Sequence, residues 1–240
     1  MKRLLSVFVL AAALGGCSDS TSEPAAPEVS TKVDATRPLV FLTHPTEPPC
    51  SYLDGTGAFA GTNVELARKI AAAMGAELKI EGVEFDTIIP RLKAGTADFG
   101  IATITITEAR KRDVFFSDPY ETGGVCFLYR TDGVKPRMSQ LASQRIGVET
   151  GTLEDIYLCR HGCDPIRFAS MNDAVDALSS NKVDAVFFDA IPLRHRAQTS
   201  GGRFVTTPLE TREHYGVAVS KHRPDVLAAA NKVIAEGRAK

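Results

Sequence analysis

A short cluster of polar side chains follows one of the apolar runs of the chain and has the chemistry of an anion site. Thr103, Thr105, Thr107 and Arg110 lie at the end of the run 99–104 or just beyond it. Hydroxyls and free backbone N–H groups at such a turn can donate hydrogen bonds, and an arginine can hold a carboxylate through two parallel N–H···O bonds. The segment therefore predicts a carboxylate site, although a solvated polar loop would show the same local pattern.

A carboxylate ends an apolar run in the other half of the chain. Asp189 could bind an ammonium group there, or it could cap the helix expected over 190–197. Gly151 and Thr152 offer a further backbone contact for an anion at a helix start. Arg110 and Asp189 together would suit a zwitterion, and a ligand that touched both would hold the two halves of the chain together.

Two cysteines are close enough in sequence for a local disulfide. Cys159 and Cys163 flank His161, and export would place them in an oxidising compartment. A metal site that includes His161 is the alternative, but it lacks a second ligand pair at a zinc-like spacing. We therefore expect a possible disulfide between Cys159 and Cys163, and neither a metal ion nor another cofactor.

The elements that would position these residues alternate between strands and helices, which indicates an α/β fold. Thr62 and Glu65 form a capping box at the start of one helix, and Asp86 is expected to cap another. Strands are expected at 39–42, 78–80, 99–104, 145–148 and 185–188, and a further helix at 172–180. In parallel α/β sheets ligands gather at the carboxyl ends of strands, where the polar residues above are found.

One sequence pattern occurs in both halves of the chain at the same kind of junction. The segments 92–98 and 178–184 both read Leu-x-x-Gly/Asn-x-x-Asp and each precedes an expected strand. Gly95 and Asn181 are the residue types that take the left-handed conformation at helix ends. The repetition favours two similarly built lobes.

The N-terminus has the organisation of an export signal. Met1-Lys2-Arg3 is basic, the run 4–14 is apolar, and small residues lead to Cys17. The run is too short to span a bilayer, which needs roughly 20 apolar residues. Leu14-Gly15-Gly16-Cys17 resembles the lipobox of bacterial lipoproteins, which implies a lipoprotein signal peptide over 1–17, lipidation of Cys17 and attachment to a membrane. Residues 18–36 have almost nothing to bury and are expected to form a flexible tether.

The balance of charge excludes one class of partner. The chain has 28 Lys and Arg against 29 Asp and Glu, with no basic stripe. Nucleic-acid binding needs a positively charged surface, so we expect no nucleic-acid partner.

Several longer motifs follow one another along the chain. They are Gly61-Thr62-Asn63-Val64-Glu65, Phe85-Asp86-Thr87-Ile88-Ile89-Pro90, Ile101 to Arg110 followed by Phe116-Ser117-Asp118-Pro119-Tyr120, Gly147-Val148-Glu149-Thr150-Gly151-Thr152, and Tyr215-Gly216-Val217-Ala218-Val219. In this order they resemble bacterial extracellular solute-binding proteins of family 3, the polar amino-acid receptors of ABC importers. The resemblance implies a two-lobed α/β Venus-flytrap fold of type II with two crossover strands, near 121–126 and 212–215. Its lobes would comprise 37–124 with 212–240, and 125–211.

The resemblance also implies a function and assigns site residues. The protein would be a periplasmic monomer, not an enzyme, that passes its ligand to an ABC permease. The position of Arg110 binds the α-carboxylate in amino-acid-binding relatives, and those of Thr105 and Thr152 assist. The position of Asp189 binds the α-amino group with a share from that of Thr103. Phe85 falls where relatives often place an aromatic wall.

Two positions depart from the family pattern. Glu47 stands near the place of an aromatic residue that packs on the ligand side chain, so it could favour a cationic or hydroxylated ligand, or face solvent. His44 stands where binders of basic amino acids often carry Asp, which weakens an assignment to lysine or arginine. We include both among the candidate ligand-binding residues.

Two other functions remain open on the same scaffold. Some relatives are periplasmic cyclohexadienyl dehydratases, and Glu47, Glu149 or Glu154 could supply the acid that such an enzyme needs. The chain could also be a ligand sensor that imports nothing. Binding without turnover would separate a receptor from an enzyme.

Overall fold

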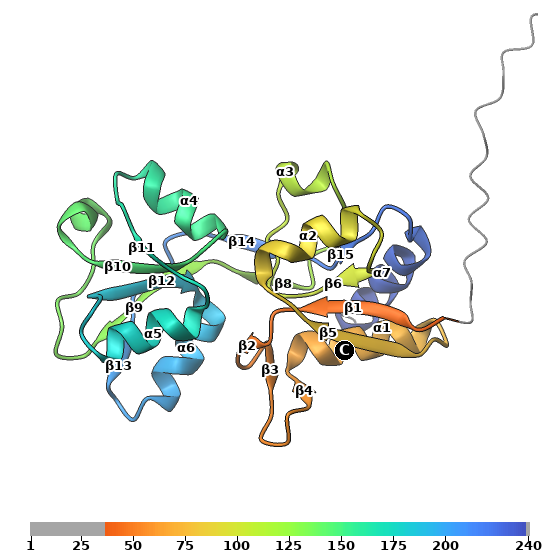
Figure 1. The fold of residues 1–240 in the computed structure, drawn as a ribbon, viewed down its shortest axis with the longest axis horizontal. Helices are drawn as coiled ribbons and strands as arrows, with labels where there is room; N and C mark the ends of the chain where they lie inside the picture. Colours follow the sequence, from red (N-terminus) through yellow and green to blue (C-terminus); the bar gives the residue numbers. More distant parts are fainter. Residues whose placement is uncertain (1–36, 239–240) are drawn as a thin grey trace, which may run out of the picture. The chain divides into compact units, whose positions relative to one another are not determined.

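The computed structural model describes residues 37–238, which form two α/β lobes (Figure 1). The first lobe is built on a five-stranded sheet of order β5-β1-β6-β15-β7. Its strands are β1 (Leu39–Thr43), β5 (Leu78–Gly82), β6 (Phe99–Gly100), β7 (Phe115–Phe116) and β15 (Ala218–Val219). Its helices are α1 (Thr62–Ala73), α2 (Phe85–Lys93), α3 (Glu108–Lys111) and α7 (Pro224–Arg238), and a small sheet is formed by β2 (Thr46–Glu47), β3 (Ser51–Leu53) and β4 (Phe59–Ala60).

The second lobe is built on another five-stranded sheet, of order β11-β10-β12-β9-β13. Its strands are β9 (Val125–Arg130), β10 (Ile146–Glu149), β11 (Ile166–Phe168), β12 (Ala185–Asp189) and β13 (Phe204–Thr206). Its helices are α4 (Leu153–Arg160), α5 (Met171–Ser179), α6 (Ala190–Thr199) and the short 3-10 helix η1 (Met138–Ser143). β10 pairs in parallel with β11 and β12, whereas β9 is antiparallel to β12 and β13.

Two strands carry the chain between the lobes, as predicted. β8 (Glu121–Gly123) and β14 (Glu213–Tyr215) pair with each other in antiparallel orientation. Figure 1 shows both on the path from one lobe to the other. Parallel strands joined through helices, with two crossover strands, are the type II periplasmic-binding architecture.

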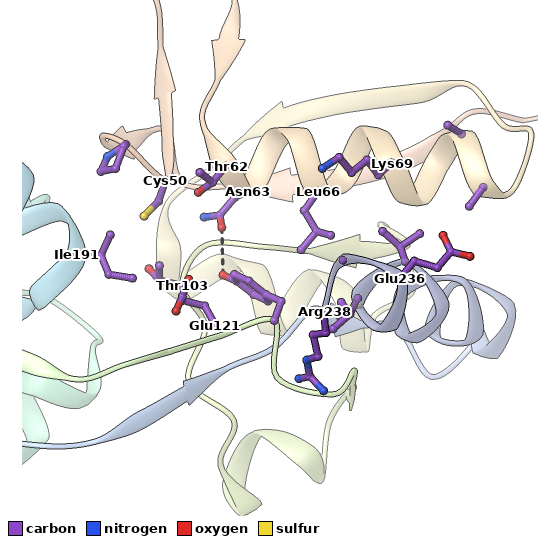
Figure 2. A pocket seen from close by; sticks show the side chains of 17 residues that line it. Cys50, Thr62, Asn63, Leu66, Lys69, Thr103, Glu121, Ile191, Glu236 and Arg238 are labelled. Carbon is purple, nitrogen blue, oxygen red and sulfur yellow. Dashed lines mark hydrogen bonds between the residues drawn. The ribbon is translucent and has the colours of Figure 1, made fainter. Parts of the chain in front are cut away.

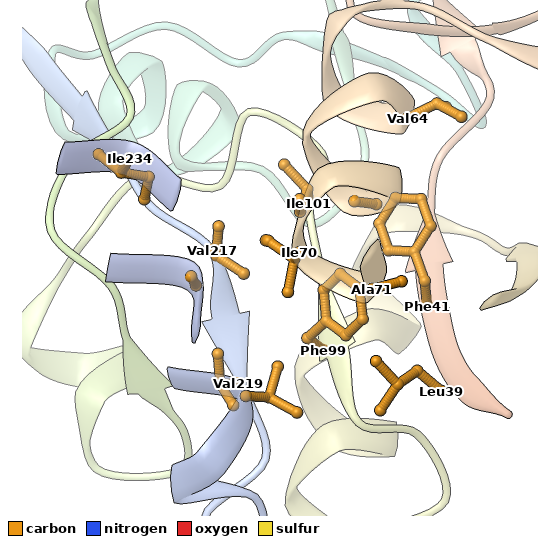
Figure 3. Close-up of a cluster of buried hydrophobic side chains, with 13 residues drawn as sticks. Leu39, Phe41, Val64, Ile70, Ala71, Phe99, Ile101, Val217, Val219 and Ile234 are labelled. Carbon is orange, nitrogen blue, oxygen red and sulfur yellow. The ribbon is translucent and has the colours of Figure 1, made fainter. Parts of the chain in front are cut away.

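The core of the first lobe shows why α1 forms where it does. Its residues Val64, Ala67 and Ile70 recur at helical spacing, so one face is apolar and packs on the sheet. Phe41 and Phe99 from neighbouring strands stack beneath that face with ring centroids 5.1 Å apart (Figure 3). This packing fixes the strand ends from which the polar loops of the first lobe emerge.

The N-caps of two helices differ from the prediction by one or two residues. Thr62 was predicted to be the N-cap, but it is the first helical residue of α1, and the cap is Gly61 at φ 111°. A Cβ at Gly61 would lie 2.3 Å from the carbonyl oxygen of Cys50, so only glycine fits there. Asp86 was expected to cap α2, but Glu84 holds that place without a side-chain hydrogen bond.

The pattern shared by the two halves has the same conformation in both. Gly95 has φ 71° and Asn181 has φ 61°, so both take the left-handed form that ends a helix before a strand. The expected strand 99–104 is shorter, since regular pairing stops at Gly100. Thr103 has φ 48°, a value that no strand residue adopts, and this turn interrupts the strand.

Candidate functional site

A small pocket between the lobes gathers every predicted ligand-binding residue except His44. It is lined by Glu47, Phe85, Thr103, Thr105, Arg110, Thr152, Leu153, Glu154, Phe188 and Asp189. The free volume is about 10 Å³, room for about one water molecule. The polar groups thus converge in a closed site, and a larger ligand requires them to separate.

Arg110 is held in place by the turn that precedes it. The Thr107 hydroxyl caps α3 by accepting a hydrogen bond from the Arg110 backbone N–H at 3.2 Å. The guanidinium donates to the Thr105 carbonyl at 3.0 Å and lies 5.4 Å from the ring centroid of Phe85. Burial lowers the pKa of Arg110 despite the opposing charges of Glu154, Asp189 and Glu213, but at ordinary pH the side chain remains a cation. No carboxylate of the described residues forms an ion pair with it.

The threonines expected to assist Arg110 are already engaged. Thr105 donates to Glu213 Oε2 at 2.6 Å, so this hydroxyl lies against the crossover strand β14. Thr152 is the N-cap of α4, where its hydroxyl accepts from the Asp155 N–H at 3.4 Å and donates to the Glu149 carbonyl at 2.9 Å. Thr152, Leu153 and Glu154 at the start of α4 line the pocket from the second lobe.

Asp189 lies at the carboxyl end of β12 and is buried. Its carboxylate accepts a hydrogen bond from the hydroxyl of Tyr215 on the crossover strand β14. It occupies the N-cap position of α6 but makes no side-chain capping bond. The carboxylate lines the pocket instead of capping the helix. Burial, followed by the charge of Glu154, raises its pKa well above the ordinary value.

Two further carboxyl groups, those of Glu154 and Glu47, line the pocket without an ion-pair partner among residues 37–238. Burial raises the pKa of Glu154 to about 7. Burial, together with the charges of Glu149 and Asp189, raises the pKa of Glu47 well above its ordinary range. Glu47 does not face solvent: it is 1 % exposed and accepts from the Thr103 hydroxyl at 3.0 Å. The sequence suggests Glu154 only as a possible catalytic acid, although its place in the first turn of the helix after Thr152 is a signal for a pocket residue.

His44 lies beside the pocket, in a second cluster with Glu47 and Glu149. His44 Nε2 is 3.6 Å from Glu149 Oε1, and the ligand atoms of all three side chains lie within 4.8 Å of one another. Burial raises the pKa of Glu149 to about 8. No local sequence pattern predicts this cluster, because Glu149 comes from the other lobe and lies more than a hundred residues beyond His44 and Glu47.

The two cysteines considered for a disulfide are free thiols in the structure. Cys163 is buried with its sulfur 3.9 Å from the Leu141 carbonyl oxygen. Cys159 is exposed on α4, where its sulfur lies 3.6 Å from Asp155 Oδ1 and 3.3 Å from Arg167 Nη2. The thiols thus have separate environments, one in the core and one at the surface.

A larger cavity of about 750 Å³ lies between α1 and α7 and reaches Thr103 and Ile191 (Figure 2). Its walls include the long side chains of Lys69, Glu236 and Arg238. An Asn63–Tyr120 hydrogen bond of 3.1 Å crosses it near Thr103. It is an open groove with scattered polar groups, whereas the smaller pocket brings the cation Arg110 of the first lobe together with carboxylates of both lobes. We therefore place the candidate site in the smaller pocket.

The signal peptide, lipobox and tether predicted for residues 1–36 lie outside the described residues. Among residues 37–238, the structure contains no helix that is long and apolar enough to cross a bilayer.

Comparison with known proteins is consistent with this geometry. The L-cystine-binding protein TcyJ of Escherichia coli (strain K12) is 28% identical over 80% of this chain and 74% of its own length. Holo ArgBP from T. maritima is 33% identical, covers 83% of this chain and 90% of its own, and superposes with a TM-score of 0.78. The ancestral amino-acid-binding protein AncCDT-1, described as a precursor of cyclohexadienyl dehydratase, is 25% identical with a TM-score of 0.78, covering 84% of this chain and 90% of its own.

The family described as bacterial extracellular solute-binding proteins, family 3, matches residues 39–240, which include both lobes and the pocket between them. The two-lobed fold and the amino-acid-binding relatives agree with that match. The chain belongs to family 3 of the bacterial extracellular solute-binding proteins.

Proposed function

We propose that this protein captures an α-amino acid between its lobes and delivers it to an ABC importer. The observation that carries the proposal is that a half-buried cation, Arg110, and a buried carboxylate, Asp189, face one pocket from different lobes. An α-amino acid presents the complementary pair of charges on adjacent atoms. A sugar would offer neither charge, and burying unpaired charges is costly.

The carboxylate end of the ligand belongs with Arg110. Its guanidinium is anchored by the Thr105 carbonyl and lacks an ion-pair partner among residues 37–238, so it is available for two parallel bonds to a carboxylate. The N–H groups at the start of α4, after Thr152, can donate to the same anion from the second lobe.

The ammonium end belongs with Asp189. Tyr215 holds this carboxylate through its hydroxyl, and Thr103 lies within the same pocket. An ammonium group would replace the missing cation beside a buried carboxylate and thereby restore its ionised form. Glu47 and Glu154 would face the remainder of the ligand, and their carboxyl groups favour a cationic or hydroxylated side chain.

Binding by closure follows from the volume of the pocket. About 10 Å³ does not admit an amino acid, so the lobes must separate for entry and close again around the ligand. The ligand stabilises the closed form only through its greater affinity for that form.

We propose that residues 1–17 direct export to the periplasm and that Cys17 carries the lipid anchor. In cells, Cys17→Ala should move the protein from the membrane fraction to the soluble periplasmic fraction. Membrane attachment that persists in this variant would remove the lipobox assignment.

The test of ligand binding is a thermal-shift screen of the full chain against the common amino acids. A ligand at about 100 times its dissociation constant adds about 2.7 kcal/mol of stability, which such a screen detects. Calorimetry then compares each ligand that binds with its analogue lacking the amine. Asp189→Asn should weaken the amino acid much more than the analogue, with Asp164→Asn, whose side chain is 97% exposed, as the matched control.

Equal losses for both ligands would remove the ammonium role of Asp189. The same samples should be incubated with prephenate, because Glu154 is a buried carboxyl group whose pKa of about 7 suits a general acid. Turnover of prephenate would identify a dehydratase instead of a receptor.

A further inference from the structure

We propose that His44, Glu47 and Glu149 form a binding site for a divalent transition-metal ion that bridges the two lobes beside the pocket. Zn²⁺ is the ion that fits this donor set best, since zinc accepts imidazole nitrogen and carboxylate oxygen together and commonly has three protein ligands. The metal site shares Glu47 with the pocket, whereas His44 and Glu149 are not among the residues that line it.

The first observation is the orientation of His44. Its Nδ1 lies 2.8 Å from the Val83 carbonyl oxygen, and because a carbonyl can only accept, Nδ1 carries the hydrogen. In the neutral ring, Nε2 then holds a lone pair. This atom is buried without a hydrogen-bond partner in a residue that is 2 % exposed, and it points toward Glu149. A histidine that donates one ring N–H to a carbonyl and directs the other nitrogen into a carboxylate cluster has the arrangement of a metal ligand.

The second observation is the support given to each carboxylate. Glu149 Oε2 accepts from the Met171 backbone N–H at 2.9 Å, which leaves Oε1 facing His44. Glu47 accepts from the Thr103 hydroxyl at 3.0 Å. Both carboxylates are therefore fixed by one hydrogen bond each, the outer support that metal-binding carboxylates need.

The ligand atoms of His44, Glu47 and Glu149 are only slightly farther apart than the ligand atoms of a zinc site. Ligand atoms about 2.0–2.1 Å from a tetrahedral zinc ion lie roughly 3.3 Å apart. His44 Nε2 and Glu149 Oε1 are separated by 3.6 Å, and no pair in the cluster exceeds 4.8 Å. Rotations that move the oxygens by about 1 Å would bring all three atoms into reach.

The charges favour a divalent ion over a simple ion pair. Glu47 and Glu149 are 1 % and 2 % exposed, and His44 is the only basic side chain among residues 37–238 that pairs with either. A protonated His44 could balance Glu149 but would leave the Glu47 carboxylate uncompensated. A divalent cation with a neutral imidazole balances both carboxylates at once.

The site would join the lobes. His44 and Glu47 belong to the segment that follows β1, whereas Glu149 ends β10 in the other sheet. A metal held by all three would bind the closed arrangement and not a separated one, so it would stabilise closure. Consequently, substituting a metal-binding residue in either lobe should abolish metal binding.

The experiment is calorimetric titration of Zn²⁺ into the full chain after removal of metals with EDTA. We expect one zinc ion per chain, with an affinity at least about 100-fold lower in His44→Gln and in Glu149→Gln. Glutamine at position 149 keeps the shape and the Met171 hydrogen bond, so this variant should fold. Glu84→Gln and the double variant Cys159→Ser/His161→Ala are the controls and should bind zinc as the original chain does.

X-ray absorption of the zinc-loaded chain provides a second readout. Nitrogen and oxygen neighbours at about 2.0–2.1 Å, without a sulfur neighbour near 2.3 Å, are expected. Absence of stoichiometric zinc binding would overturn the proposal. So would binding that survives substitution of His44 and Glu149, or that is lost in the Cys159→Ser/His161→Ala control.

Discussion

Two buried carboxylate regions of this molecule have opposite electrostatics. At the edge of the first lobe, Asp98 is 1 % exposed and accepts hydrogen bonds from Arg37, Arg223 and the Val40 N–H. Burial alone would raise its pKa, but Arg37, Val40 and Arg223 together bring it below the ordinary value. Between the lobes, burial raises the pKa of Glu47, Glu149, Glu154 and Asp189, and among residues 37–238 no arginine or lysine forms an ion pair with any of them.

The difference distinguishes the buried charges of the Asp98 cluster, which are already paired within the protein, from the carboxyl groups between the lobes, which can still bind a cation. The Asp98 cluster is internally balanced, so it contributes to folding and has nothing left to bind. The groups between the lobes are fixed by hydrogen bonds but lack counter-ions, so a bound cation or ammonium would be stabilised there.

The largest effect expected is on stability, at the balanced cluster. Asp98→Asn should lower the free energy of unfolding by about 3 kcal/mol, because the charge of the buried Arg223 side chain would lose this counter-ion. Urea unfolding monitored by circular dichroism measures the change. A loss no larger than that of a surface pair would mean that Asp225 alone suffices for Arg223, and the contrast between the two regions would weaken.

A different pattern is expected for the cation of the pocket. Arg110→Ala should lower the affinity for the amino-acid ligand by at least about 2 kcal/mol, roughly 30-fold, because a desolvated carboxylate would lose its charged partner. The unfolding free energy of the ligand-free protein should change much less, since Arg110 has no ion pair to break in the described structure. Calorimetry and urea unfolding on the same sample provide both values, and unchanged affinity would contradict the role of Arg110.

The dependence on pH should also differ between the regions. The pKa of Glu154 is raised from 4.5 to about 7, so its protonated form stabilises the fold at low pH, and this contribution is lost as the pH rises through about 7. Asp98 behaves in the opposite sense: its contribution is present above 3.8 and is lost as the pH falls through its lowered pKa.

Glu154→Gln isolates the first effect, because glutamine resembles the protonated acid at every pH. In EDTA, the variant and the original chain should have similar stability near pH 4.5, and the variant should become the more stable one as the pH rises to 8. Urea unfolding across this range measures the gap. A gap that stays constant or closes with rising pH would show that Glu154 is not destabilised by burial in the folded state.

The smallest effect is expected at an exposed pair, which completes the comparison. Lys93 and Asp113 form a 2.8 Å ion pair with side chains 63 % and 37 % exposed. Asp113→Asn should leave the urea midpoint unchanged within error, because water and salt screen such pairs. A clear loss would imply that position, rather than burial, decides which carboxylates stabilise this fold.

Residue types at strand ends predicted most of the pocket. Asp189 ends a strand, Thr152 and Arg110 lie beyond the ends of two others, and the alternation of elements places strand ends at one edge. The left-handed conformations of Gly95 and Asn181 were also predictable, because each depends on local sequence alone.

Features that depend on tertiary contact were not predictable. The cluster of His44, Glu47 and Glu149 exists only because the lobes meet. The helix start at Gly61 is set by the approach of the Cys50 carbonyl, and the short strand β6 ends because Thr103 turns toward Glu47. None of these contacts leaves a periodic signal in the sequence.

The place of β15 in the first sheet has a consequence for how the chain folds. This strand, residues 218–219, lies between β6 and β7, and everything from β8 to β14 is made before it. The second lobe is one continuous segment and can assemble as soon as it is synthesised. The first sheet must wait for nearly the whole chain, and its distant strand pairings are slow to form. During synthesis, the first lobe is therefore the part that stays open longest to proteases and to aggregation.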